Sequence, residues 1–281
     1  MKVGHTGITW GIPGDVEQGY RDTAELGYLG FETFAQTILT WNEQPGGYRA
    51  LVERYGIPTG AAYCHKTWID PATATEELAA ARREADALQA VSGQTLVLQA
   101  GRRLPGGYSA DQFRTLAAAL NEIGRYCRDR GLATGLHPHT GTAIETRPEI
   151  DTILGLLDPV YVGFAPDTGQ IAKGGSDILE VMRTYRRRIT HVHLKDWNGS
   201  YDKDAEGNDI DSSGYVNYEP VGNGSLPMPA ILDVLIEDGF DGWVNVELDG
   251  TRHAPRPPRE AAAMSRQYLG RVLGNHVAWR A

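Results

Sequence analysis

The sequence predicts one α/β domain folded as a (β/α)8 TIM barrel that spans residues 1–281, and three observations support this. Short runs of β-type residues alternate with longer amphipathic segments, as in repeated βα units. Eight such runs occur, and eight strands each followed by a helix close into a barrel. The length of 281 residues suits one such unit, because barrels of this class commonly run to about 250 residues.

The expected strands are short runs rich in apolar and β-branched residues, bounded by turn residues. They cover residues 3–9, 29–33, 58–64, 95–99, 133–138, 161–165, 189–194 and 243–247. No GxGxxG string follows the first run, which argues against an open sheet of the dinucleotide-binding type.

Between these runs, segments rich in Ala, Leu, Glu and Arg have high helix propensity. The expected helices cover 74–91 and 110–130, and others start near Arg147, Ser176, Met228 and Pro258. Residues 196–226 break the alternation, because they form a long, polar, glycine-rich stretch directly after the seventh run. Long loops inside compact domains are usually functional or disordered, and we expect this one to lie over the barrel mouth.

Composition argues against several classes of protein. The formal net charge of −9 argues against a nucleic acid partner, since such proteins usually present a basic face. The two cysteines, Cys64 and Cys127, are too few for a disulfide framework and fit a reducing compartment. Neither a signal-peptide pattern nor an apolar run of about 18 residues occurs. We therefore expect a cytoplasmic protein without membrane contact, and a homo-oligomer stays open.

Side chains that suit metal binding and acid–base chemistry gather where the expected strands end. In a barrel, these carboxyl ends meet at the face that carries the active site. The strand ends supply Glu32, His65, Gln99, His137, His139, Asp167, Gln170, His191, His193, Lys195, Asp196, Glu247 and Asp249. This concentration is the main sign of a functional site.

The spacing of these residues points to a metal. The histidines form two pairs two residues apart, so each pair points to one face of its strand; they are His137 with His139 and His191 with His193. Asp167 and Glu247 each close an apolar strand, and a shared divalent cation would satisfy both carboxylates together with one or two imidazoles. Singly, each residue also fits an ordinary structural role, such as an Asx-turn at Asp167. Their joint occurrence favours the metal.

The strings around these residues resemble the xylose isomerase-like sugar isomerase/epimerase superfamily, and within it the inosose (2-keto-myo-inositol) dehydratases. They are AELGYLGFET (24–33), IPTGAAYCHKTW (57–68), GLHPHTGT (135–142), PDTGQIAKGG (166–175), RITHVHLKD (188–196), VGNG (221–224) and GWVNVELDGT (242–251). The resemblance extends over nearly the whole chain, and the HVHLKD and GWVNVE strings are specific in combination.

The resemblance implies a divalent metal, which this superfamily holds with a Glu, Asp, His, Glu set on strands five to eight. Three positions carry over to Asp167, His193 and Glu247, whereas His137 stands in place of the first Glu. Manganese, cobalt, magnesium and zinc all suit such ligands. Gln170 and Thr140 stand where the dehydratases usually have His and Met, so the chain departs from that branch at two positions.

The implied activity is that of a metal-dependent lyase, which removes water from a keto-cyclitol or keto-sugar through an enediolate. A small polyhydroxylated ketone would be the substrate. We expect His139, Lys195 and Glu247 as catalytic groups, with the pKa of Lys195 lowered beside the metal. The expected substrate-binding residues are Trp10, Glu32, His65, Gln99 and Gln170.

Three alternatives stay open. A metal-dependent ketose epimerase or isomerase shares the first half of the mechanism, with Glu32 as a possible second base. A phosphodiesterase of the endonuclease IV type shares the barrel but needs more metal ligands. A catalytically silent sugar-binding barrel would bind no cation.

Overall fold

The fold was analysed in a computed structural model, which describes residues 1–11, 15–201, 217–249 and 256–280. Its main sheet is entirely parallel and has the order β6-β5-β4-β3-β2-β1-β10-β7. The strands are β1 (Lys2–Thr6), β2 (Phe31–Phe34), β3 (Thr59–His65), β4 (Thr95–Gln99), β5 (Ala133–His137), β6 (Gly163–Phe164), β7 (His191–Leu194) and β10 (Trp243–Val246). Two isolated parallel bridges, Phe164 to Ile189 and Asp167 to His193, join β6 to the β7 side and close the barrel.

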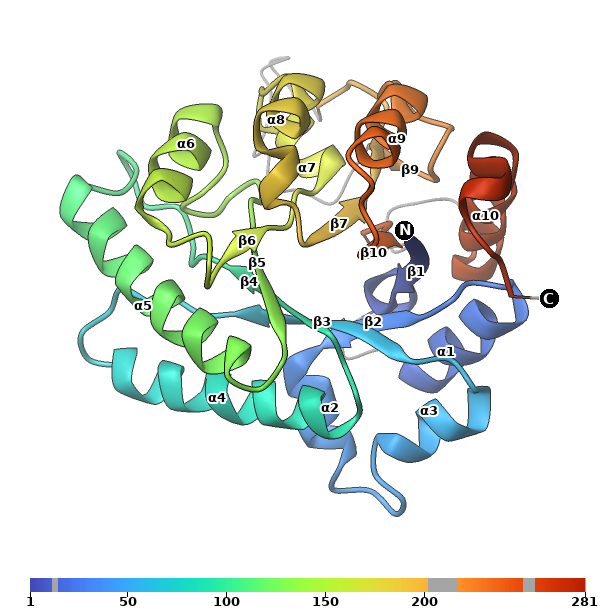
Figure 1. Cartoon of the computed structure of the whole chain (residues 1–281), viewed down its shortest axis with the longest axis horizontal. Helices are drawn as coiled ribbons and strands as arrows, with labels where there is room; N and C mark the ends of the chain where they lie inside the picture. Colours follow the sequence, from blue (N-terminus) through green and yellow to red (C-terminus); the bar gives the residue numbers. More distant parts are fainter. Residues whose placement is uncertain (12–14, 202–216, 250–255, 281) are drawn as a thin grey trace, which may run out of the picture.

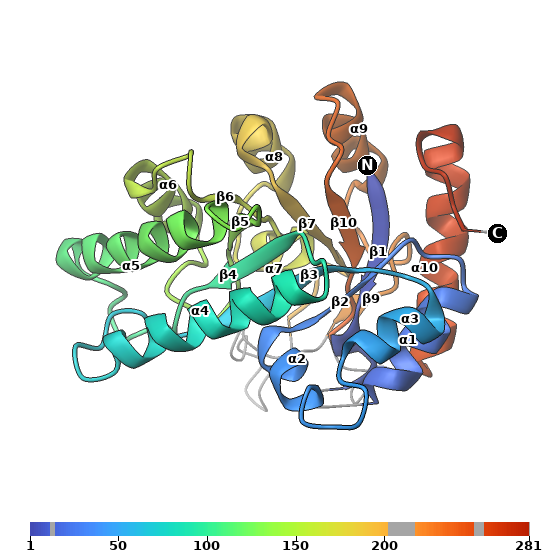
Figure 2. The same ribbon diagram turned by 60° about the horizontal axis from the view of Figure 1, so that its bottom comes forward.

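The helices lie around the outside of these strands (Figure 1), as expected for a TIM barrel. They are α1 (Val16–Glu25), α2 (Ala35–Trp41), α3 (Arg49–Tyr55), α4 (Ala74–Ala90), α5 (Ala110–Arg128), α6 (Arg147–Leu156), α7 (Thr168–Lys173), α8 (Ile178–Tyr185), α9 (Met228–Glu237) and α10 (Pro258–Leu273). The two longest, α4 and α5, lie side by side next to β3, β4 and β5 (Figure 2). The predicted fold class is confirmed.

Local sequence explains where several helices begin. Ser109 accepts a hydrogen bond from the backbone N–H of Gln112, whose side chain accepts from the backbone of Ser109, and this capping box starts α5. Thr146 and Glu149 form the same box at α6. Asp177 caps α8, so this helix begins two residues later than the expected start near Ser176.

Several strands are shorter than the sequence patterns suggested, and two of them have a clear local cause. The first run, expected to extend to residue 9, leaves the strand after Thr6 and continues as the 3-10 helix η1 (Gly7–Trp10). A Cβ at Gly7 would lie 2.7 Å from the Phe31 ring, so only glycine fits this turn. In the sixth strand the ladder ends before Pro166, which has no N–H to donate.

The stretch after β7 forms a small second sheet, in which β8 (Asp196–Trp197) pairs antiparallel with β9 (Tyr218–Glu219). The carboxylate of Asp196 accepts hydrogen bonds from the backbone N–H groups of Trp197, Gly222, Gly224 and Leu226. This carboxylate therefore ties both ends of the stretch together. Residues 202–216, which make up about half of the expected cover of the barrel mouth, lie outside the described residues.

Within the part of the chain that the structure describes, no helix is long and apolar enough to cross a membrane.

Candidate active site

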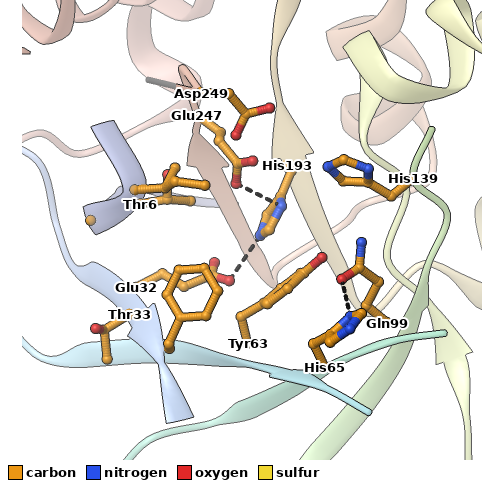
Figure 3. Close-up of a pocket in the computed structure, with 13 residues that line it drawn as sticks. Thr6, Glu32, Thr33, Tyr63, His65, Gln99, His139, His193, Glu247 and Asp249 are labelled. Atoms are coloured by element: carbon orange, nitrogen blue, oxygen red, sulfur yellow. Dashed lines mark hydrogen bonds and ion pairs between the residues drawn. The ribbon is translucent and has the colours of Figure 1, made fainter. Parts of the chain in front are cut away.

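A cavity of about 380 Å³ opens at the carboxyl ends of the strands (Figure 3). It is the place where the sequence predicted a site. The lining residues are Thr6, Gly7, Ile8, Glu32, Thr33, Phe34, Tyr63, His65, Gln99, His139, His193, Glu247 and Asp249.

Three of the four expected metal ligands come together beside this cavity. His137 ends β5, Asp167 follows β6 and His193 lies in β7, and one ligand atom of each lies within 4.8 Å of the other two. The fourth, Glu247, has its Oε2 atom 2.8 Å from Nδ1 of His193. All four side chains are buried.

The cluster contains buried polar atoms without hydrogen-bond partners. Neither ring nitrogen of His137 has one, although its side chain is only 1% exposed. Buried polar atoms are nearly always satisfied in folded proteins. A divalent cation at this place would supply the missing partner for His137, and a set of imidazoles and carboxylates suits such a cation.

Glu32 orients the imidazole of His193. Its Oε1 atom lies 2.8 Å from His193 Nε2, while Oε2 accepts from His191 Nε2 at 2.8 Å and from Asn245 Nδ2 at 2.6 Å. Since a carboxylate accepts, the proton of His193 lies on Nε2 and its lone pair on Nδ1. Nδ1 and Oε2 of Glu247 therefore need a proton or a cation between them.

Lys195 lies among three carboxylates and is fully buried. Its ammonium nitrogen is 2.9 Å from Asp167 Oδ2, 2.8 Å from Glu247 Oε1 and 2.5 Å from Asp249 Oδ2. Together with Glu32, four buried carboxylates thus surround one lysine and a few imidazoles in the described part of the site. This excess of negative charge favours a cation.

The pKa shifts follow from this charge balance. Burial lowers the pKa of His193, but Glu247 and Glu32 outweigh it and raise that pKa well above its usual value. Burial raises the pKa of Asp167, and it raises the pKa of Asp249 to about 6. Burial also raises the pKa of Glu247, yet the positive charges of His193 and Lys195 bring it well below normal.

The pKa of Lys195 was expected to be lowered beside the metal. Burial does lower the pKa of this ammonium, but the surrounding Asp167, Asp249 and Glu247 raise it well above the usual value. These carboxylates keep Lys195 cationic beside the cavity, and its role next to a metal stays a prediction.

His139 is held in one tautomer. Its Nδ1 atom lies 2.7 Å from the carbonyl oxygen of Thr140, which can only accept, so Nδ1 carries the hydrogen and Nε2 the lone pair. Burial, followed by the charge of Lys195, lowers the pKa of His139 to about 4. The imidazole is thus neutral at neutral pH, and it lines the cavity.

His65 and Gln99 lie opposite each other at the ends of β3 and β4 and both line the cavity. His65 Nδ1 lies 2.6 Å from Gln99 Oε1. In Figure 3 the Gln99 amide lies between the rings of His65 and His139. These three residues form one polar side of the cavity.

Two residues expected to bind substrate lie elsewhere. Trp10 is not among the described lining residues, and its Nε1 donates to Asp22 Oδ2 at 2.8 Å. Gln170 is 1% exposed and is not among them either. Its Oε1 accepts from the hydroxyls of Thr140 at 2.6 Å and Tyr218 at 2.7 Å, and its Nε2 donates to Asp249 at 3.0 Å. Gln170 therefore holds the Asp249 carboxylate in place by a hydrogen bond, without lining the cavity itself.

Several residues of the site were missed in the sequence. Tyr63 lines the cavity, and its ring lies 5.2 Å from the ring of His137 and 6.1 Å from that of His193. The two-residue spacing of Tyr63 and His65 on one strand could have revealed it. Tyr218 lies within the 196–226 stretch that was expected over the barrel mouth, although no periodicity singled out this residue.

Sequence comparison with known proteins finds several relatives of this chain. An inosose dehydratase from Geobacillus kaustophilus is 27% identical over 302 aligned residues, which cover 99% of this chain and 96% of the relative. Further inosose dehydratases match over only 54 to 57% of their length, so this chain spans about half of each.

Two solved structures share the fold at low sequence identity. A 3-keto-D-glucoside 4-epimerase, YcjR from E. coli, superposes with a TM-score of 0.71 and 20% identity over 97% of this chain and 98% of its own. The IolI protein with a bound zinc atom gives a TM-score of 0.79 and 15% identity, with 97% and 98% covered.

A family model decides the assignment. It describes the xylose isomerase-like TIM barrel and matches residues 20–269, which is most of the chain. The resemblance seen in the sequence strings is thereby confirmed, and the chain belongs to the xylose isomerase-like TIM barrel family.

Proposed function

We propose that this protein is a metal-dependent lyase that dehydrates a keto-cyclitol or a related keto-sugar through an enediolate. The observation that carries the proposal is the buried cluster of His137, Asp167, His193 and Glu247 beside a cavity lined by hydrogen-bonding side chains. The similarity to inosose dehydratases supports a small polyhydroxylated ketone as the substrate.

His137, Asp167, His193 and Glu247 would hold the cation, and the unpartnered nitrogens of His137 are the best support for it. A divalent ion there supplies Lewis acidity, which polarises a ketone and acidifies the neighbouring C–H bond. Manganese, cobalt, magnesium and zinc remain candidates. Glu32 keeps Nδ1 of His193 directed at the cluster through its bond to Nε2.

His139 is the base of the proposed reaction. Its Nε2 lone pair is available because the bond to the Thr140 carbonyl places the hydrogen on Nδ1. The low pKa, about 4, keeps the ring in its basic form at neutral pH. It would take the proton from the carbon next to the ketone.

Lys195 would stabilise the negative charge that then develops on the substrate oxygen. Its raised pKa keeps it cationic, and the surrounding carboxylates fix its place before the reaction starts. Glu247 would act together with Lys195, since its carboxylate contacts both Lys195 and His193.

His65 and Gln99 would bind substrate hydroxyls on the polar side of the cavity. The ring of Tyr218 lies 4.9 Å from the ammonium of Lys195, which supports a location of the end of the 196–226 stretch next to the site.

The test is incubation of the metal-analysed protein with 2-keto-myo-inositol, followed by ultraviolet absorbance and NMR. We expect loss of water and a conjugated product, and removal of the metal with a chelator should stop the reaction. An equilibrium mixture of two epimers without loss of water would instead establish the epimerase alternative.

A further inference from the structure

The proposed dehydration needs a catalytic acid, and no residue has yet been assigned to that role. A hydroxide ion is a poor leaving group, so the departing β-hydroxyl must receive a proton as its bond to carbon breaks. His139 would act as the base, because its Nδ1 hydrogen is bonded to the Thr140 carbonyl and its Nε2 offers a lone pair. Another residue of the cavity must therefore supply this proton.

His65 has the geometry for this role. Its Nδ1 lies 2.6 Å from the amide oxygen of Gln99, and because that oxygen can only accept, Nδ1 carries a hydrogen. Its Nε2 has no hydrogen-bond partner among the described residues, and the side chain lines the cavity. Gln99 is buried, with 7% exposed, and its backbone oxygen accepts from Trp68 Nε1 at 2.8 Å. The imidazole of His65 is thus held by one nitrogen and offers the other.

The solvent access of the two histidines differs. His139 is half-buried, whereas His65 is exposed at the rim. A ring in contact with water can take up a proton from solvent after each turnover, which a catalytic acid requires.

The other proton-bearing groups at the cavity are less suited to this role. The ammonium of Lys195 is directed at Asp167, Glu247 and Asp249. Burial raises the pKa of Tyr63 well above its usual value, so its phenol is a weak acid. Asp249 Oδ2 accepts from both Lys195 and Gln170, which favours its ionised carboxylate, while its Oδ1 has no hydrogen-bond partner among the described residues.

We propose that His65 is the general acid of the dehydration and that Gln99 is its positioning residue, an inference that rests on the proposed lyase activity. The α C–H bond breaks as the base takes its proton, and the electron pair enters the enediolate. That pair then forms the C=C bond while the β C–O bond breaks. Nε2 of His65 gives its proton to the departing oxygen, which leaves as water, and solvent reprotonates the ring.

A change of leaving group tests this role directly. The probes are 2-keto-myo-inositol and its analogue with fluorine in place of the departing β-hydroxyl, because fluoride leaves without a proton. For His65→Gln we expect water elimination to fall by about 100-fold or more, and fluoride release to stay within about threefold of the wild-type rate. Gln99→Leu should show the same preference to a smaller degree. His276→Gln, at an exposed histidine outside the cavity, is the matched control.

Hydrogen exchange gives a second readout. In heavy water, His65→Gln should still exchange the α hydrogen at close to the wild-type rate, because enediolate formation does not use His65. Circular dichroism should confirm an intact fold, as expected for a substitution at an exposed side chain.

The outcomes separate the two proposals. Equal loss on both probes would make His65 a binding residue, and no loss on either would exclude it from the reaction. Both results overturn the acid role while the wild type still releases water. A wild-type protein that dehydrates no keto-cyclitol or keto-sugar would overturn the lyase activity and the acid role together.

Discussion

The hydroxyl of Thr140 donates a 2.6 Å hydrogen bond to the amide oxygen of Gln170. These are the two positions at which the sequence departs from the dehydratase pattern, and the structure joins them into one buried unit with Tyr218 and Asp249. The two departures therefore form a hydrogen bond with each other, and the unit holds the Asp249 carboxylate in place at the cavity.

This unit predicts a coupled loss of stability. Thr140→Val and Gln170→Met each remove buried hydrogen bonds and should cost about 1–3 kcal/mol in the free energy of unfolding. Because the two side chains contact each other, the double variant should lose less than the sum of the single losses. Urea unfolding of the four proteins measures this, and strict additivity would contradict the coupling.

Glu32 predicts an effect on metal affinity. Its carboxylate holds Nε2 of His193, and Glu32→Ala would free that ring to turn. We expect divalent metal affinity to fall by about 10- to 100-fold, the usual effect of losing such a partner. Isothermal titration calorimetry measures it, with Glu122→Ala, which breaks a surface ion pair to Arg82, as the control. Unchanged affinity would show that His193 does not depend on Glu32.

Lys195 predicts a link between metal and stability. Lys195→Met leaves three buried carboxylates without their shared cation, which should cost about 3–5 kcal/mol in the metal-free protein. A divalent metal should restore part of this loss, so the rise in Tm on adding metal should exceed that of the wild type.

The matched control is Lys66→Met, which removes the partner of buried Glu84, a pair outside both the cluster and the cavity lining. It should also lower Tm, but metal should not restore it. If metal rescued both variants equally, the rescue would not come from the cluster.

His5 predicts acid sensitivity. Burial lowers its pKa to about 4 in the folded chain, below the ordinary value of 6.5 for histidine. The unfolded chain binds more protons between these values, so stability is full above pH 6.5 and is lost as the pH falls through 4. His5→Phe, packed between Trp10 and Tyr28, should reduce the loss of unfolding free energy between pH 7 and 4.5. An unchanged pH dependence would contradict this origin.

The barrel was predictable because strand and helix periodicities are local properties of the sequence. Asp167, His193 and Glu247 were equally accessible to prediction, since parallel strand ends meet at one face and the residues stand at those ends. Their roles as ligands remain predictions.

What the sequence could not reveal depends on side-chain direction. Gln170 follows a strand end, yet it starts a helix and turns toward Thr140, away from the cavity. Trp10 was expected near the substrate, but the chain leaves β1 early at Gly7 and the indole packs beside Asp22. The pKa of Lys195 is raised for a third reason, because Asp249, two residues beyond Glu247, adds a further negative charge beside the ammonium.

The closure of the barrel has a mechanical consequence. β6 and β7 are joined only by isolated bridges among the described residues, and one of these links Asp167 to His193. The seam of the cylinder thus runs through the candidate metal cluster. A cation bound by both side chains would link β6 to β7 at the place where backbone hydrogen bonding is sparsest. Binding of the cation would then also stabilise the closed barrel. Backbone amide protons along the β6–β7 seam would therefore exchange more slowly in the metal-bound protein.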